Sequence, residues 1–261
     1  LSNQFGQDIG VTVHVLQACN SLLQGQTRRA ATHLDDAESL ANSSGHIQTI
    51  CYQLFMRFIV GMASGDRLDV ERCLNKSAPI AQEHNLALWL AFVPYSTLVV
   101  AAYNGDKTSM ERWRKADATI CASNFTMFIA SFRIDLARSA LAMGFHDDAA
   151  ELAMMAQEII DETGEAFALS DLHRLQASMA IADDDTETAE KYLVTALDVA
   201  RRQGSKLWEL RAAIDLAYLW YEQGRIGEAV ALLDPVHSSI ADGDCPEDRG
   251  TAQAMLREFT T

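Results

Sequence analysis

The sequence lacks the signatures of several protein classes. Only four prolines occur in 261 residues, and runs that alternate apolar with polar residues are absent, which argues against a sheet protein. We find no phosphate-binding GxxxxGK[ST] loop and no GxGxxG, GxSxG or HExxH motif, so the common nucleotide-binding, hydrolase and zinc-protease signatures are missing. We therefore expect this chain to be no enzyme and to need no cofactor.

Cysteine and histidine are sparse and unpaired. The five cysteines form no CxxC pair and are odd in number, which suits free core thiols in a reducing cytoplasm. The seven histidines show no i, i+4 pair, so no metal site is predicted. The acidic loop around Asp242–Asp248 lacks the ligand spacing of an EF-hand and is expected to be solvated.

Positive charge is scarce, most of all in the second half. Residues 1–130 hold 11 acidic and 10 basic residues, whereas 131–261 hold 25 acidic and 11 basic, and the whole chain carries a formal charge of −15. Such a surface repels nucleic acid and anionic lipid, so neither is an expected partner.

Long uncharged runs are also rare, with one exception. Positions 85 to 105 hold no charged residue, a length that could cross a bilayer. Pro94 to Thr97 interrupt it and no basic residues flank it, so a buried helix is the favoured interpretation. No signal peptide is visible. Because the chain begins at Leu1, we expect it to be part of a longer protein.

What the sequence does contain is a repeat of about 40 residues. Turn-type glycines recur at Gly25, Gly65, Gly105, Gly144 and Gly224, and the missing member falls on Asp183–Asp185. A second series, half a repeat out of phase, comprises Gly45, Asn85, Asn124, Gly164, Gly204 and Gly243. Two interleaved series predict a helix-turn-helix unit repeated about six times. The predicted fold is an all-α, right-handed superhelical solenoid of TPR-like repeats.

The whole chain, 1–261, is predicted to be a single domain of this kind. Its units are expected at about 8–45, 46–85, 86–124, 125–164, 165–204 and 205–243, followed by a helix at 246–259 that caps the exposed end of the stack.

Small residues recur at matched positions of the units. Four units carry alanine five residues after the turn and seven before it, where small side chains let two helices approach closely. Units two and three carry larger residues there. The alanines are Ala30, Ala149, Ala189, Ala229, Ala18, Ala137, Ala177 and Ala217.

Four stretches resemble a known family. They are FGQDIGV (5–11), EHNLALWLAF (83–92), SDLHRLQASM (170–179) and, most closely, ALDVARRQGSKLWELRAAIDLAYLWYEQGRIGEAVALLDPV (196–236). The chain is similar to the C-terminal tetratricopeptide-like repeat region, of the transcription-activator type, in bacterial signalling proteins with a class III adenylate/guanylate cyclase and a STAND-like ATPase. It departs from that pattern at 178–183 and 238–240. The resemblance implies a regulatory module, because no cyclase or ATPase site is present here.

In this repeat class the first helix of each unit lines the concave face, which predicts a groove. Positions 13, 10, 6 and 3 residues before each turn should point into it. The candidate groove residues are Tyr52, Phe55, Phe92, Tyr95, Arg138, Asp171, Arg174, Arg211 and Tyr218. Arg138, Arg174 and Arg211 form a candidate clamp for a carboxylate or phosphate.

Plainer interpretations stay open for these residues. Arg174 and Arg211 could form ordinary ion pairs with Asp171, Glu209 or Asp215. The aromatic residues of units two and three could simply pack in the core.

One main function and two alternatives follow as expectations. The first is a non-catalytic module that binds a protein segment or small ligand in its groove and controls an upstream ATPase and cyclase domain. The alternatives are an oligomerisation scaffold that self-associates through the low-charge N-terminal half, or the sensor region of an ATPase-type transcriptional regulator.

Overall fold

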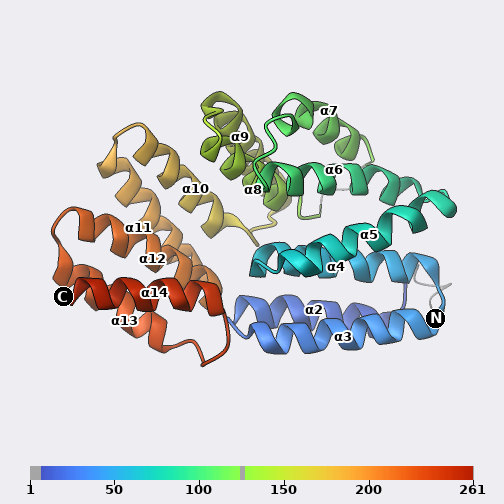
Figure 1. Cartoon of the computed structure of the whole chain (residues 1–261), viewed down its shortest axis with the longest axis horizontal. Coiled ribbons are helices and arrows are strands. Elements are labelled where there is room, and N and C mark those ends of the chain that lie inside the picture. The colour runs from blue at the N-terminus through green and yellow to red at the C-terminus, as the bar shows by residue number, and fades with distance from the viewer. Residues whose placement is uncertain (1–6, 124–126, 261) are drawn as a thin grey trace.

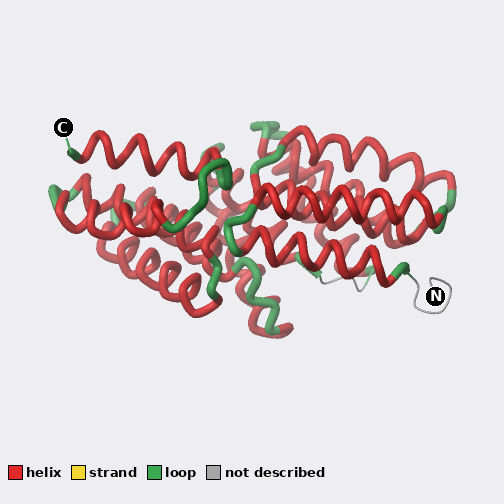
Figure 2. Tube along the Cα trace, turned by 90° about the horizontal axis from the view of Figure 1, so that it is seen from below, coloured by secondary structure: helices red, strands yellow, loops and turns green. Residues whose placement is uncertain are grey.

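The computed structural model describes residues 7–123 and 127–260, and these form an all-helical repeat solenoid (Figure 1). Within these ranges there are thirteen helices and no strand, and loops join the helices at their ends (Figure 2). The helices are α2 (Ile9–Leu23), α3 (Thr27–Ser44), α4 (Ile47–Ser64), α5 (Arg67–Glu83), α6 (Ala87–Tyr103), α7 (Ser109–Ala122), α8 (Ile129–Ala142), α9 (His146–Thr163), α10 (Leu169–Ala182), α11 (Thr186–Gln203), α12 (Lys206–Glu222), α13 (Ile226–Ser238) and α14 (Pro246–Phe259).

Consecutive helices pack as antiparallel hairpins, from α2 with α3 to α12 with α13. The turn series is confirmed where the structure describes it, since every glycine of both series has a positive φ, as does Asn85. At the position without glycine, Asp184 adopts φ 59°, because a short polar side chain tolerates the left-handed conformation better than most. Asn124, the remaining member, lies outside the described residues.

Alanine packing holds the two helices of a hairpin together. All eight alanines of the matched positions are at most 1% exposed. In units two and three the corresponding positions hold larger residues, and these are buried too. At one of these positions, Phe58 lies 5.8 Å from the Phe92 ring, edge to face, and the Phe132 ring contacts both. The wider space between these helices is thus filled by aromatic rings.

The two ends of the solenoid meet, which the sequence did not predict. The loop between α13 and α14 lies against the turn between α2 and α3, and α12 contacts α2 (Figure 1). The Cys245 amide donates to Thr27 Oγ1 at 2.9 Å, and the Arg28 amide donates to Asp244 Oδ1 at 2.9 Å. At Gly25 any side chain would collide with Ile240, since an added Cβ would lie 2.7 Å from its Cδ1.

The final helix therefore has a different setting from the one expected. Helix α14 packs on α12 and α13, as a following helix should. However, the loop that leads into it closes the stack onto the first hairpin, so the C-terminal end is not simply an open end with a cap.

Helix α6 is the uncharged segment noted in the sequence. It packs within the stack, with Trp89, Phe92 and Tyr95 buried. Across the described ranges, none of the helices combines the length and apolarity that a membrane span requires.

We predict that the closure depends on the Asp244 carboxylate. This side chain is buried and accepts from the Arg28 amide and from Thr27. In Asp244→Ala the Arg28 amide and the Thr27 hydroxyl lose a charged acceptor, which should lower the free energy of unfolding by about 1–3 kcal/mol in urea titrations. The matched control is Asp242→Ala two residues away, whose side chain is 97% exposed. Equal stability of the two variants would contradict the prediction.

Candidate functional site: a charged pocket on the concave face

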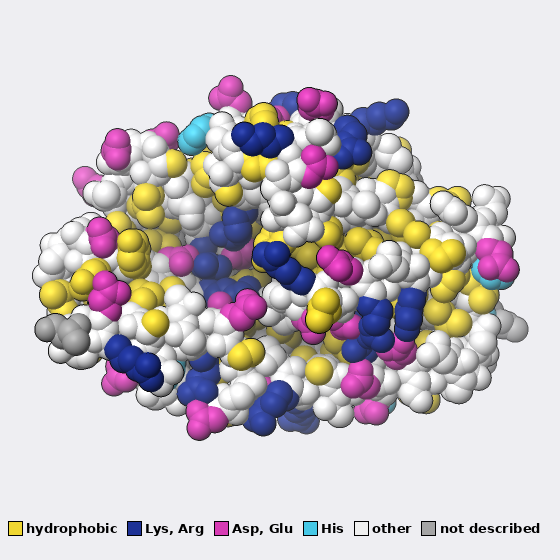
Figure 3. Space-filling model, in the orientation of Figure 1, with side chains coloured by type: hydrophobic (Ala, Val, Ile, Leu, Met, Phe, Trp, Pro, Cys, Tyr) yellow, Lys and Arg dark blue, Asp and Glu magenta, His cyan; other side chains and the backbone are white. Residues whose placement is uncertain are grey.

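The concave face holds a pocket of about 220 Å³ between α4, α8, α10, α12 and α14. Figure 3 shows a hollow where lysine or arginine side chains gather beside acidic ones, surrounded by a mostly uncharged surface. The charged residues that line the pocket are Asp135, Arg138, Asp171, Arg174, Arg211 and Glu247.

Carboxylates pair with each of the three pocket arginines. Asp171 Oδ1 accepts from Arg138 Nη2 and from Arg174 Nη1, both at 2.8 Å. Arg174 also donates through Nε to Asp215 at 2.7 Å. Arg211 Nε donates to both oxygens of Asp248 at 3.0 Å. The first three bonds form one polar network across α8, α10 and α12, and the Arg211 pair separately joins α12 to α14.

The network holds its members charged. Burial alone would lower the pKa of Arg174, but the carboxylates of Asp215 and Asp171 outweigh it and raise that pKa. Burial would likewise raise the pKa of Asp171, but Arg138 and Arg174 outweigh it and lower that pKa. Asp171 is thus an ionised acceptor whose removal would take one partner from Arg174 and the ion-pair partner from Arg138.

Asp135 has the opposite environment. Its carboxylate has no hydrogen-bond or ion-pair partner among the described residues. Burial, reinforced by the neighbouring Asp171 charge, raises its pKa to about 7. One turn away on α8, Ser131 Oγ is buried and also without a partner among the described residues. The Asp135 carboxylate and the Ser131 hydroxyl are thus two polar groups of the pocket to which no described residue supplies a hydrogen bond.

The remaining wall of the pocket is apolar. Ile59 and Met62 come from α4, Phe132 from α8, Phe167 from the segment before α10, and Trp208 from α12. Arg211 also lies over the Trp208 ring, 5.2 Å from its centroid. The pocket can therefore hold a ligand that has both a charged end and an apolar part.

The structure brings four of the sequence-predicted groove residues into this pocket: Arg138, Asp171, Arg174 and Arg211. The simpler interpretation as ion pairs also holds for Arg174, which pairs with Asp171 and Asp215. Arg211 pairs with Asp248, whereas Glu209 pairs with Arg201 and Lys206.

None of the five aromatic candidates lines this pocket. Phe55, Phe92 and Tyr95 are at most 2% exposed and belong to the core. For these three the plainer interpretation as core packing holds, and their assignment to the groove is wrong. Tyr52 is half-buried against the same core, and Tyr218 is 55% exposed on α12.

Tyr95 has a structural partner instead. Its hydroxyl donates to Asp117 Oδ1 at 3.0 Å, and Asp117 is bound by Arg133 through two hydrogen bonds of 3.0 Å. All three side chains are buried. This closed network satisfies a tyrosine hydroxyl in the core and leaves it unavailable to a ligand.

Sequence reasoning missed several pocket residues: Tyr103, Phe132, Asp135, Phe167, Trp208 and Glu247. Asp135 alone had a usable signal, since it stands four residues after Ser131 and three before Arg138 on the same face of a helix. Glu247 reaches the pocket only because the ends of the solenoid meet.

In comparisons with known proteins, no family model matches this chain and no curated protein is significantly similar to it.

We predict that Asp135 makes stability fall as pH rises. The carboxyl binds its proton more tightly in the folded chain, with a pKa of about 7, than at the ordinary value of 3.8. Between about pH 4 and 7 the unfolded chain releases this proton while the folded chain keeps it, so the free energy of unfolding falls as pH rises. In Asp135→Asn this loss disappears, so the variant should exceed the parent at pH 8 by on the order of 2 kcal/mol and match it near pH 4.

Urea titrations at the two pH values measure this difference. Asp234→Asn on α13, an exposed position, is the control and should change stability equally at both. A difference between parent and Asp135→Asn that does not grow with pH would contradict the prediction.

Proposed function

We propose that this chain is a non-catalytic ligand-binding module of a signalling protein, and that its concave pocket binds a small ligand, or the end of a peptide, that carries both charges. The observation that carries the proposal is the unsatisfied pair Asp135 and Ser131 beside a row of arginines. A cationic group would pair with Asp135, and an acidic group with the arginines.

The arginines retain hydrogen-bonding capacity for such a ligand. Arg138 uses Nη2 and Arg211 uses Nε toward described carboxylates, which leaves other N–H groups of each guanidinium. The side chains of both remain partly exposed, at 35% and 18%. A volume near 220 Å³ suits one small molecule or one residue rather than an extended peptide.

The resemblance of the sequence supplies the rest of the proposal. In a parent protein with an ATPase and a cyclase domain, occupancy of the pocket would control those domains. The pocket is lined by helices from several units of the solenoid, so a ligand that prefers one arrangement of them would shift their equilibrium. The same mechanism would serve the sensor region of a transcriptional regulator.

A thermal-shift screen of the whole chain tests the binding proposal. The probes are the twenty free amino acids, each compared with its N-acetyl and its amide derivative. We expect at least one zwitterion to raise Tm, and both derivatives, which lack one charge, to have little effect. Ligand binding at 100 Kd would stabilise the chain by about 2.7 kcal/mol.

Three variants locate the site. Arg138→Ala and Asp135→Asn should weaken binding at least tenfold in calorimetry, because each removes a charge-assisted partner worth about 1.5–3 kcal/mol. Arg112→Ala on α7, 60% exposed, should leave affinity unchanged. If no zwitterion binds, or if all three variants bind alike, the pocket does not have this function.

A second candidate function, self-association, is supported by the outer face of α2. Ile9, Val13 and Leu16 lie on one side of this helix and are 44%, 46% and 56% exposed. The equivalent positions of units two and five are all buried against the preceding unit. They are Thr49, Gln53 and Met56 in α4, Ala168 just before α10, and Leu172 and Leu175 within α10.

This face replaces the one expected from the sequence. The aromatic residues of the N-terminal half are mostly buried, whereas α2 exposes a face whose counterparts in units two and five are buried. A second copy that presents its own α2 would cover it, with the apolar ridges of the two helices packed together.

We predict a reversible dimer of the whole chain in sedimentation velocity experiments. Leu16→Glu should shift it to monomer, because a carboxylate would be buried in the interface. The control is Leu68→Glu on α5, where the parent leucine is 81% exposed and isolated from this face. A parent chain that stays monomeric at high concentration would rule out self-association.

A further inference from the structure

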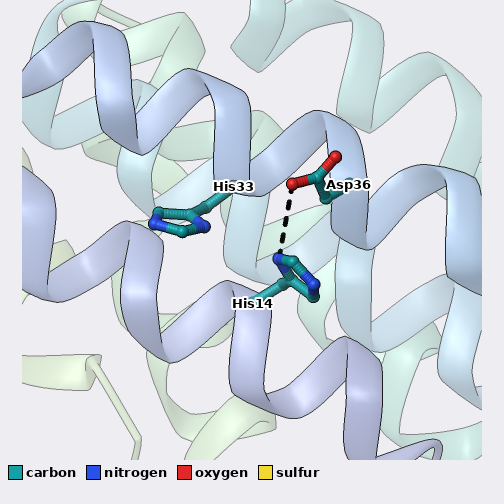
Figure 4. A group of neighbouring side chains, drawn as sticks. All are labelled: His14, His33 and Asp36. Atoms are coloured by element: carbon teal, nitrogen blue, oxygen red, sulfur yellow. Dashed lines mark ion pairs between the residues drawn. The ribbon is translucent and has the colours of Figure 1, made fainter.

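Two histidines and an aspartate meet between α2 and α3, far from the pocket. His14 projects from α2, and His33 and Asp36 project from α3 toward it (Figure 4). His14 Nδ1 lies 3.7 Å from Asp36 Oδ2, and the two imidazole centroids are 5.7 Å apart. One donor atom from each of the three side chains lies within 4.8 Å of the others.

The two imidazoles are not satisfied by the protein. Nδ1 of His14 and Nδ1 of His33 are both buried, and neither has a hydrogen-bond partner among the described residues. Two adjacent unsatisfied ring nitrogens are costly unless something binds them. A cation that replaces the missing partners would remove this cost.

We propose that His14, His33 and Asp36 bind a divalent transition metal of the Zn²⁺ type. Two imidazoles and a carboxylate suit Zn²⁺ and its neighbours, whereas Mg²⁺ and Ca²⁺ require oxygen ligands throughout. Three protein ligands leave one coordination position for water. Asp36 is half exposed, so the site is open to solvent and a metal can enter.

The geometry requires only small side-chain movements. With bond lengths of 2.0–2.1 Å, ligand atoms of a tetrahedral zinc site lie about 3.3 Å apart. Closing from within 4.8 Å needs a rotation of the exposed Asp36 side chain and a slight tilt of the imidazoles. No backbone change is needed, because the helix contact already places the three residues together.

Cys19 also lies on α2, but its sulfur is not among the ligand atoms that lie within 4.8 Å of one another. The site therefore consists of the two histidines and the aspartate.

A bound ion would connect the two helices of the first hairpin. The turn of that hairpin receives the closing loop before α14. Metal binding would thus stabilise the part of the solenoid on which the closure rests.

Zn²⁺ and Co²⁺ titrations of the chelator-treated whole chain test the proposal by calorimetry and visible absorption. We expect one ion per chain, a rise in Tm with Zn²⁺ and the appearance of Co²⁺ d–d bands. Mg²⁺ should produce neither. His33→Ala and Asp36→Asn should each weaken Zn²⁺ binding by more than the roughly 10–100-fold that loss of an outer-sphere partner causes.

The control is His84→Gln at an exposed position of another unit, which should leave both stoichiometry and affinity unchanged. Asp36→Asn changes an exposed side chain and should fold normally, so its result stands even if His33→Ala is unstable. The proposal is overturned if the parent binds no Zn²⁺, or if Asp36→Asn and His84→Gln bind it as well as the parent does.

Discussion

Close packing of alanine between paired helices is the contact on which the rest of this structure depends. Ala18 with Ala30, and their equivalents in three later units, are almost fully buried, so the two helices of a hairpin approach closely. A hairpin cannot bury its own apolar face, and stability comes from stacking each unit on the next. The turns with positive φ, including Asp184, keep every hairpin in the same register.

Departures from that rule give the molecule its particular shape. In units two and three, Phe58 and Leu98 stand where other units have alanine, and the added volume is filled by rings from α4, α6 and α8. At the other end, the loop before α14 packs on the first turn. The chain therefore encloses its concave face, and residues such as Glu247 and Asp248 reach a pocket formed by much earlier helices.

Electrostatics in the pocket follow from this enclosure. Asp171 and Asp135 are two carboxylates of one site whose pKa values move in opposite directions. Asp171 is hydrogen-bonded to Arg138 and Arg174, whereas for Asp135 burial and the Asp171 charge outweigh the more distant arginines. The difference arises from which carboxylate the guanidinium groups bind directly, and it leaves a titratable group near neutral pH.

The sequence by itself determined the helical class and the turns, because these depend on local signals that recur with one period. It also placed Arg138, Asp171, Arg174 and Arg211 on the concave side. Only the tertiary structure decided that Phe55, Phe92 and Tyr95 are core residues. Likewise, only the tertiary structure places His14 beside His33 and brings the two ends of the solenoid together at Gly25. Those outcomes depend on contacts between helices, and spacing along one helix carries no information about what its neighbour presents.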